Sequence, residues 1–216
     1  MPGYTIELDL TGRRALVVGL GRVGRRKAAG LVEAGALVLV VDPGPSATDP
    51  PPGVEVRAEP YRADHLRGAA LAIAAAPAAI NRRVVADAKA RGIWVSSASE
   101  PASGDFAVPA TWRDGPVTLT VSTAGASPAL AAVLRDRAAA ALGPGASGLA
   151  RLLAELRPRV LALLPDPEAR RRLLTTWADP LWLDLWASAG PDAVLRELNG
   201  ALARAVANPR GVDADC

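Results

Sequence analysis

One stretch near the start of the chain strongly limits the folds that the sequence can adopt. The apolar run Ala15–Val18 is typical of a buried strand, Gly19-x-Gly21-x-x-Gly24 follows at once, and a helical pattern begins behind it. In this order the first glycine allows a tight turn, the second lets the backbone approach a pyrophosphate, and the third lets the helix pack on the strand. N–H groups at the start of the helix then face the phosphates. The motif predicts a Rossmann-like, dinucleotide-binding α/β fold.

An acidic residue stands where such a fold uses one. The apolar run Val38–Val41 ends at Asp42, about 20 residues beyond the motif, where a carboxylate can bind a ribose 2′-hydroxyl and repel a 2′-phosphate. We therefore expect NAD as the cofactor. The residues expected to bind it are Gly19, Gly21, Arg22, Val23, Gly24, Asp42, Pro43, Ala75 and Ala76. The alternative is a fold that keeps the glycine turn for packing alone.

The first half of the chain alternates strand and helix patterns. Further strands are expected at 54–57, 71–75 and 93–95, and helices at 22–34 and 77–91, with glycines closing both helices. This order predicts a doubly wound, parallel sheet. A ligand should then lie at the carboxyl ends of the strands, beside Gly19–Gly24, Asp42, Ala74–Ala76 and Ser96–Ser99.

The first helix begins with cations, although the helix dipole disfavours positive charge there. Arg22, Arg25, Arg26 and Lys27 all lie within its first two turns. They form either a solvated basic face or a site where a cofactor phosphate or a substrate carboxylate compensates the charge. The second interpretation makes Arg25 and Arg26 candidates for binding an anionic substrate.

Composition excludes several classes of protein. The formal net charge of the 216 residues is only +3 and just two residues are lysine, which argues against a nucleic-acid partner. Cys216 and His65 are the only residues of their types, so neither a disulfide framework nor a His/Cys metal cluster is expected within the chain. The sequence has neither a signal-peptide pattern nor an apolar run of about 20 residues, so we expect a cytoplasmic protein without membrane contact.

The second half has a different pattern. Strands at 106–112 and 117–122 flank a turn sequence and predict a hairpin, and Ser127-Pro128 is a strong helix start. The rest is helical, with a kink expected at Pro158 and tryptophans expected in a small core. The expected division is a Rossmann domain (1–112), a hairpin-containing dimerisation segment (113–145), a small helical domain (146–207) and a disordered tail (208–216).

Several of these segments together match one enzyme family. They are the glycine motif running into Arg26-Lys27, the strand 71–75 followed by Asn81, Phe106-x-x-Pro109, and the distinctive Ser122-Thr123-x-Gly125-x-Ser127-Pro128. To about residue 190 the chain resembles the precorrin-2 dehydrogenases, which form the amino-terminal module of siroheme synthases and also occur as stand-alone proteins.

The resemblance implies NAD-dependent oxidation of precorrin-2 to sirohydrochlorin by a homodimer, with the active site between the domains, and in some members insertion of ferrous iron. It adds Asn81 to the cofactor-binding residues. Because the substrate is a tetrapyrrole polycarboxylate, the candidate substrate-binding residues are Arg25, Arg26, Ser122, Thr123 and Ser127.

The sequence departs from the family where a carboxylate is expected. Members carry Asn-x-x-Asp-x-Pro after the fifth strand, whereas this chain reads Ser96-Ser97-Ala98-Ser99-Glu100-Pro101. A serine at its ordinary pKa cannot act as a carboxylate base or accept protons from a chelation site. The candidate catalytic residues are therefore Ser99, at the position of the aspartate, and Glu100 and Asp105 as substitutes. No metal site is expected, and the change counts against iron chelation.

Three functions remain open from the sequence. The first is a precorrin-2 dehydrogenase without chelatase activity. The second is a diverged NAD-dependent oxidoreductase acting on another substrate, and the third is a dimer that binds NAD or a tetrapyrrole without catalysis. The change at Ser99 favours the second and third, and the intact glycine motif favours the first two.

Overall fold

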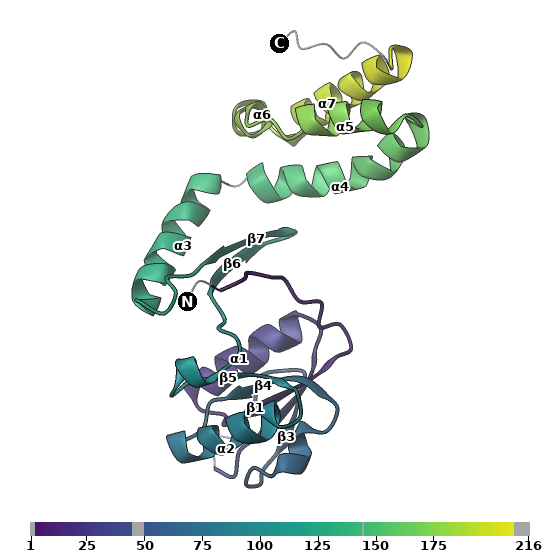
Figure 1. The fold of residues 1–216 in the computed structure, drawn as a ribbon. Helices are drawn as coiled ribbons and strands as arrows, with labels where there is room; N and C mark the ends of the chain where they lie inside the picture. Colours follow the sequence, from purple (N-terminus) through teal and green to yellow (C-terminus); the bar gives the residue numbers. More distant parts are fainter. Residues whose placement is uncertain (1–2, 45–49, 144, 210–216) are drawn as a thin grey trace. The chain divides into compact units, whose positions relative to one another are not determined.

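The chain forms two compact units that divide between Val108 and Pro109. The structure is a computed structural model that describes residues 3–44, 50–143 and 145–209. Figure 1 traces the elements of each unit. The expected dimerisation segment (113–145) and helical domain (146–207) both lie within the second unit, and their separation stays a prediction.

The first unit is a five-stranded parallel sheet in the order β3-β2-β1-β4-β5. Its elements are β1 (Arg14–Val18), α1 (Arg22–Glu33), β2 (Leu37–Val41), β3 (Val54–Arg57), the 3₁₀ turn η2 (Ala63–Leu66), β4 (Ala69–Ala74), α2 (Ala78–Lys89), β5 (Trp94–Ser97) and the 3₁₀ turn η3 (Pro101–Ser103). The chain places β2 and β3 on one side of β1 and β4 and β5 on the other, so the strand order reverses at the central strand β1. The Rossmann-like α/β fold is confirmed.

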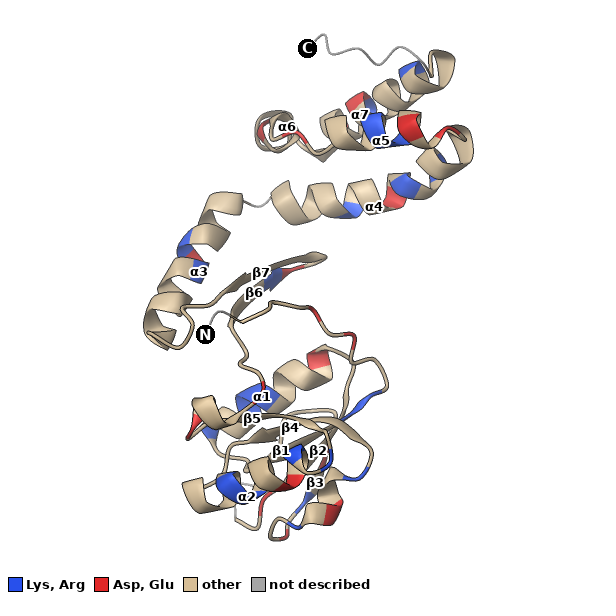
Figure 2. Cartoon of the chain, in the orientation of Figure 1, with Lys and Arg blue, Asp and Glu red and all other residues tan. Residues whose placement is uncertain are grey.

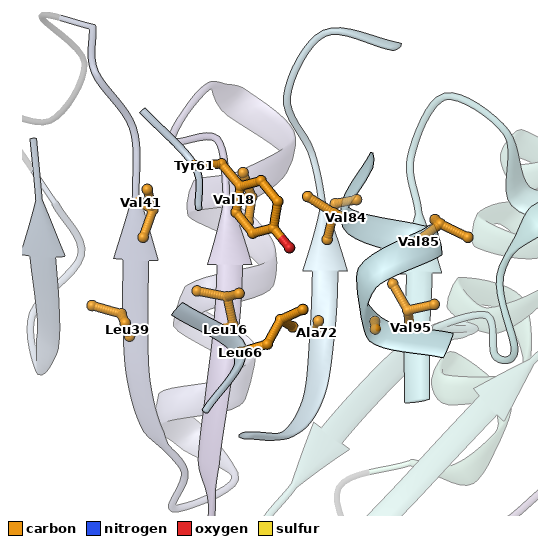
Figure 3. Close-up of a cluster of buried hydrophobic side chains, with 12 residues drawn as sticks. Leu16, Val18, Leu39, Val41, Tyr61, Leu66, Ala72, Val84, Val85 and Val95 are labelled. Atoms are coloured by element: carbon orange, nitrogen blue, oxygen red, sulfur yellow. The ribbon is translucent and has the colours of Figure 1, made fainter. Parts of the chain in front are cut away.

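Alternate residues of β1 supply two cores, because successive side chains of a strand point to opposite faces. Leu16 and Val18 pack with Val84 of α2 and with Tyr61 and Leu66 near η2. Figure 3 shows this cluster over the strands. Val17 instead packs in a second cluster, which contains residues of α1. Covering both faces explains why β1 and β2 are nearly continuous apolar runs.

The second unit begins with a two-stranded antiparallel hairpin. Its elements are β6 (Ala110–Asp114), β7 (Val117–Val121), α3 (Pro128–Leu142), α4 (Gly145–Leu163), α5 (Pro167–Thr176), α6 (Leu181–Ala189) and α7 (Pro191–Ala207). Ser127 caps α3 by accepting a hydrogen bond from Leu130 N–H at 3.1 Å, and the Asp166 carboxylate caps α5 in the same way. The helix start predicted at Ser127-Pro128 is confirmed.

A helical core holds the later part of this unit. Trp177 is fully buried among Leu173, Val194 and Leu198, and Trp182 and Trp186 pack against the same cluster. The prediction that the tryptophans form a core is confirmed.

Some boundaries differ from the sequence-based expectations. The strand expected at 106–112 begins at Ala110, because Phe106 packs against the core of the first unit instead. Although a kink was expected at Pro158, α4 continues through this residue. Most of the expected disordered tail, residues 210–216, lies outside the described residues. Among the described helices, none has the length and apolar character needed to cross a membrane.

Candidate functional site

The glycine turn between β1 and α1 is built as the motif predicts. Gly19 has a φ of +97°, and a Cβ there would lie 2.5 Å from the carbonyl oxygen of Ala75. A Cβ on Gly24 would collide with the carbonyl of Gly19, whereas a Cβ on Gly21 would meet no atom within 4 Å. Two glycines therefore serve close packing and the third leaves open space, so these residues fit the approach of a dinucleotide pyrophosphate.

Asp42 supports this turn from the end of the neighbouring strand. Its carboxylate accepts a hydrogen bond from Leu20 N–H at 2.6 Å and one from Gly44 N–H at 2.7 Å. Gly19 N–H also donates to the carbonyl of Val41 at 2.9 Å. Asp42 thus stabilises the glycine turn. It also lies at the end of β2, where a Rossmann fold carries the acidic residue that binds the ribose. The sequence reasoning missed this first role, although the adjacency of β1 and β2 in the expected sheet could have indicated it.

The start of α1 is electropositive. Its first turn contains no acidic residue, and Arg22, Arg25, Arg26 and Lys27 all lie in its first half. Figure 2 shows the basic residues along this helix. Burial, followed by the charge of Arg26, lowers the pKa of Lys27 below its ordinary value. An anion bound here would relieve the repulsion between Lys27 and Arg26, so we add Lys27 to the candidate anion-binding residues. The sequence could have indicated it, because Lys27 directly follows Arg25 and Arg26.

The carboxyl ends of β4 and β5 meet beside the glycine turn. Ala75 N–H donates to the carbonyl of Val18 at 2.8 Å, and Ala98 N–H donates to the carbonyl of Ala74 at 2.9 Å. These bonds extend the strand pairings by one step, so the backbone of both connections is fixed. Ala75 and the segment that leads to Ser99 therefore lie at the edge where a Rossmann fold binds its ligand.

Three expected site residues are joined by hydrogen bonds at this edge. Ala76 N–H donates to Asn81 Oδ1 at 2.9 Å, and Asn81 Nδ2–H donates to Ser99 Oγ at 2.9 Å. Asn81 is buried, whereas Ser99 is exposed.

The two candidate substitute carboxylates lie in different places. Glu100 follows Ser99 directly and pairs with Arg82 at 3.0 Å, and both side chains are largely exposed. Asp105 lies along the start of β5, where its carboxylate accepts from Val95 N–H at 3.0 Å and lies 3.7 Å from Lys89 Nζ. The described contacts join Ser99 to Asn81 and Glu100 to Arg82, two neighbouring residues of α2, whereas Asp105 bonds to the start of β5.

The Ser122–Ser127 loop belongs to the second unit and is closed by its own hydroxyl groups. Thr123 Oγ1 accepts from Ser127 N–H at 3.1 Å and donates to the carbonyl of Ser127 at 3.0 Å, and Ser122 Oγ accepts from Ala124 N–H at 3.2 Å. Ala124 has a φ of +51°, which is uncommon for a residue with a side chain. The hydroxyl groups expected to bind substrate therefore first hold a strained loop at the start of α3.

The only histidine of the sequence has a packing role. His65 is buried, and because its Nδ1 accepts from Arg62 N–H at 3.1 Å, its Nε2–H donates to Glu59 at 2.8 Å. Hydrogen bonds from Arg62 and then His65 lower the pKa of Glu59. Within residues 3–44, 50–143 and 145–209, no three His, Cys, Asp or Glu side chains are grouped so that they could hold a metal ion.

Comparisons with known proteins place this geometry in a family. A family model described as putative NAD(P)-binding matches residues 6–110, and the model of the sirohaem biosynthesis protein central segment matches residues 114–139. Siroheme synthase 1 of Halorhodospira halophila is 35% identical over 209 residues, which are 93% of this chain and 42% of that protein. The chain belongs to the same family as the corresponding part of the siroheme synthases.

Other relatives agree with this placement. The siroheme synthase of Chromobacterium violaceum is 37% identical over 181 residues, covering 82% of this chain and 38% of its own length. The chain thus spans about two fifths of these relatives. The solved structure of SirC, precorrin-2 dehydrogenase, superposes with a TM-score of 0.71 and 24% identity over 92% of this chain and all of that chain, and shows that the two share a fold.

Proposed function

We propose that the chain is an NAD-dependent dehydrogenase that oxidises precorrin-2 to sirohydrochlorin. The observation that carries the proposal is the intact glycine turn of Gly19, Gly21 and Gly24, supported by Asp42, in a member of this family. The name of the structural relative SirC, precorrin-2 dehydrogenase, supports the choice of substrate. A bound NAD would accept the hydride that leaves the macrocycle.

The protein's own groups have to bind, orient and deprotonate the substrate. The α1 cations Arg25 and Arg26, together with Lys27, are suited to a polycarboxylate. Oxidation removes a hydride and a proton from the macrocycle, and Ser99 cannot accept the proton. We assign that step to Glu100 or to solvent, because Glu100 is the carboxylate next to Ser99.

We also propose that the protein acts as a homodimer through α3. Leu130, Val133 and Leu134 lie at i, i+3 and i+4 on this helix, and their exposed fractions are 50%, 55% and 41%. Three large apolar side chains on one helical face favour contact with a second copy. Val133→Arg should convert a dimer to monomers in sedimentation velocity, whereas Arg196→Glu, at an exposed position on α7, serves as a charge-change control.

The decisive experiment follows sirohydrochlorin absorbance after precorrin-2 and NAD are added to purified protein. Turnover that requires NAD supports the proposal, and Glu100→Gln should slow it while Asp105→Asn affects it less. Absence of turnover at micromolar enzyme, with NAD bound, would refute the proposed substrate. We do not propose iron insertion, because Ser99 supplies no carboxylate. A gain of chelatase activity in Ser99→Asp would show that the residue at position 99 decides whether iron is inserted.

A second candidate function follows from the hydroxyl at Ser99. A diverged NAD-dependent oxidoreductase whose substrate requires no carboxylate base at this position would keep the same cofactor edge. NADH formation from another carboxylate-bearing macrocycle, without turnover of precorrin-2, would favour this candidate.

A further inference from the structure

The buried amide of Asn81 has one fixed orientation. The side chain is 1% exposed, and one of its two polar atoms lies 2.9 Å from the backbone N–H of Ala76. Because a backbone N–H can only donate, the atom facing it must be the amide oxygen. The amide nitrogen, with its hydrogens, therefore faces Ser99 Oγ at 2.9 Å.

This orientation determines how the Ser99 hydroxyl can be used. An amide nitrogen accepts no hydrogen bond, so Ser99 Oγ is the acceptor and its own proton must point elsewhere. Among the described residues, the Ser99 hydroxyl donates to no acceptor. Ser99 is also exposed at the carboxyl end of the sheet, so its proton is available to a ligand at this edge.

The backbone around Ser99 is held as firmly as its side chain. Ala98 N–H bonds to the carbonyl of Ala74 at 2.9 Å, and Glu100 N–H donates to the buried Ser97 hydroxyl at 3.2 Å. The residues on both sides of Ser99 are thus tied to the end of the sheet. A donor fixed before binding loses little freedom when a ligand arrives.

We propose that Asn81 is a positioning residue that presents the Ser99 hydroxyl as a neutral hydrogen-bond donor to a carbonyl or carboxylate oxygen of the ligand. Asn81 then acts through Ser99. The inference rests on the proposed function and deepens it, because it replaces a base at this position with a donor. The acceptor oxygen belongs to the nicotinamide carboxamide or to a carboxylate of the macrocycle.

A cysteine at position 99 tests the contact without any need for turnover. Cys216 is the only native cysteine, so Ser99→Cys in a Cys216→Ser background carries a single thiol. A thiolate that accepts the Asn81 amide hydrogen should have a pKa about 1 to 2 below the ordinary value of about 8.5. The pH dependence of the rate of alkylation by iodoacetamide reports this pKa.

Two further variants separate the amide from its surroundings. Adding Asn81→Leu, which removes the donor without adding charge, should return the thiol pKa to its ordinary range. If that variant does not fold, Asn81→Asp keeps an acceptor for Ala76 N–H and should also raise the thiol pKa. The control is Ser103→Cys, because the Ser103 hydroxyl lies in the same connection, is partly exposed and donates to the carbonyl of Glu100 at 2.7 Å. A thiol pKa in the ordinary range at position 99, or a lowered thiol pKa that does not change when Asn81 is replaced, would overturn the proposal.

Protection experiments identify the ligand and keep the two proposals apart. Saturating NAD or sirohydrochlorin should slow alkylation at position 99 at least about fivefold, and the ligand that protects supplies the acceptor oxygen. If neither protects, the donor role is wrong even where precorrin-2 is oxidised. If protection and the lowered thiol pKa are found without turnover of precorrin-2, the proposed function fails and the role of Asn81 stands.

In an active enzyme the same coupling should appear in the kinetics. Ser99→Ala should raise KM for the ligand that protects position 99 about 5- to 10-fold. Asn81→Leu should cause little further rise in KM when it is added to the Ser99→Ala variant. Additive effects of the two substitutions on KM would contradict the proposal that Asn81 acts through Ser99. Ser103→Ala, outside the site, should leave KM unchanged.

Discussion

Alanine at Gly19 and alanine at Gly21 should have opposite consequences, although both change the same motif. At Gly19 an added Cβ would lie 2.5 Å from the oxygen and 2.6 Å from the carbon of the Ala75 carbonyl, and both are backbone atoms that cannot rotate away. The φ of +97° adds backbone strain of about 1–3 kcal/mol. Overpacking adds about 1–3 kcal/mol more. The sum of about 2–6 kcal/mol is a large part of the stability of an ordinary domain.

Gly21 has neither difficulty. Its φ of −68° and ψ of −175° suit any residue, and a Cβ would meet nothing within 4 Å. Replacing Gly21 by alanine reduces the freedom of the unfolded chain, which stabilises the folded variant by about 0.4–1 kcal/mol. Alanine is a poorer N-cap residue than glycine, and this offsets part of the gain. Gly21→Ala should therefore fold with wild-type stability. If the pyrophosphate lies against this backbone, the methyl group should weaken NAD binding at least tenfold, or about 1.4 kcal/mol.

Thermal unfolding and NAD titration calorimetry separate the two roles. Gly19→Ala should lower Tm sharply without NAD, and Gly21→Ala should keep Tm but lose most of the rise in Tm that NAD produces in the wild type. Wild-type affinity for NAD in Gly21→Ala would refute the placement of the cofactor at this turn. Wild-type stability in Gly19→Ala would refute the packing argument.

Further predictions concern Asp42, Ser127 and Lys27. Asp42→Asn keeps an oxygen for Leu20 N–H but removes the charge, so the affinity for NADP relative to NAD, measured by titration, should rise at least about tenfold; an unchanged ratio contradicts the assignment. Ser127→Ala removes the cap of α3 and should cost about 1 kcal/mol in urea unfolding, whereas Ser127→Asp should retain the cap; equal losses contradict it. The folded-state pKa of Lys27 is lowered, so its charge destabilises the fold at neutral pH, and this effect fades as pH rises through that pKa. Lys27→Met should therefore raise Tm at pH 7, with a smaller gain at high pH; a lower Tm at pH 7 contradicts the argument.

The sequence was sufficient to predict the sheet because its signals are local. A buried run, a glycine turn and an amphipathic helix each lie within about 15 residues, and handedness then orders the strands. The boundaries of β5 were less predictable. Its apolar run ends at Val95, but the strand continues to Ser97 because β4 supplies backbone partners. Serine in a strand carries no apolar signal, so only the tertiary pairing defines this end.

Side-chain contacts between segments that are far apart in the sequence could not be predicted from the sequence. Asn81 and Ser99 are 18 residues apart, and they meet because β4 and β5 are neighbours whose carboxyl ends lie together. Asp105 illustrates the reverse case. It is close to Ser99 in sequence, but the chain turns back along β5 and bonds Asp105 to Val95. Sequence proximity alone could not distinguish these outcomes.

The two ends of the candidate site depend on the sequence in different ways. In the proposed site the cofactor end consists largely of backbone, since glycines, N–H groups and the helix start form it, and Asp42 is the side chain proposed to specify the nucleotide. Such a surface survives many substitutions outside the glycines. In the proposed site the opposite end relies on the Ser99 hydroxyl, and a carboxylate at position 99 would supply a base in place of that donor. Asn81 suits either group, because its amide hydrogen can be accepted by a serine hydroxyl as well as by a carboxylate. The fold can therefore retain NAD binding while the chemistry at position 99 changes, and measuring cofactor affinity and turnover separately in the same variants tests that independence.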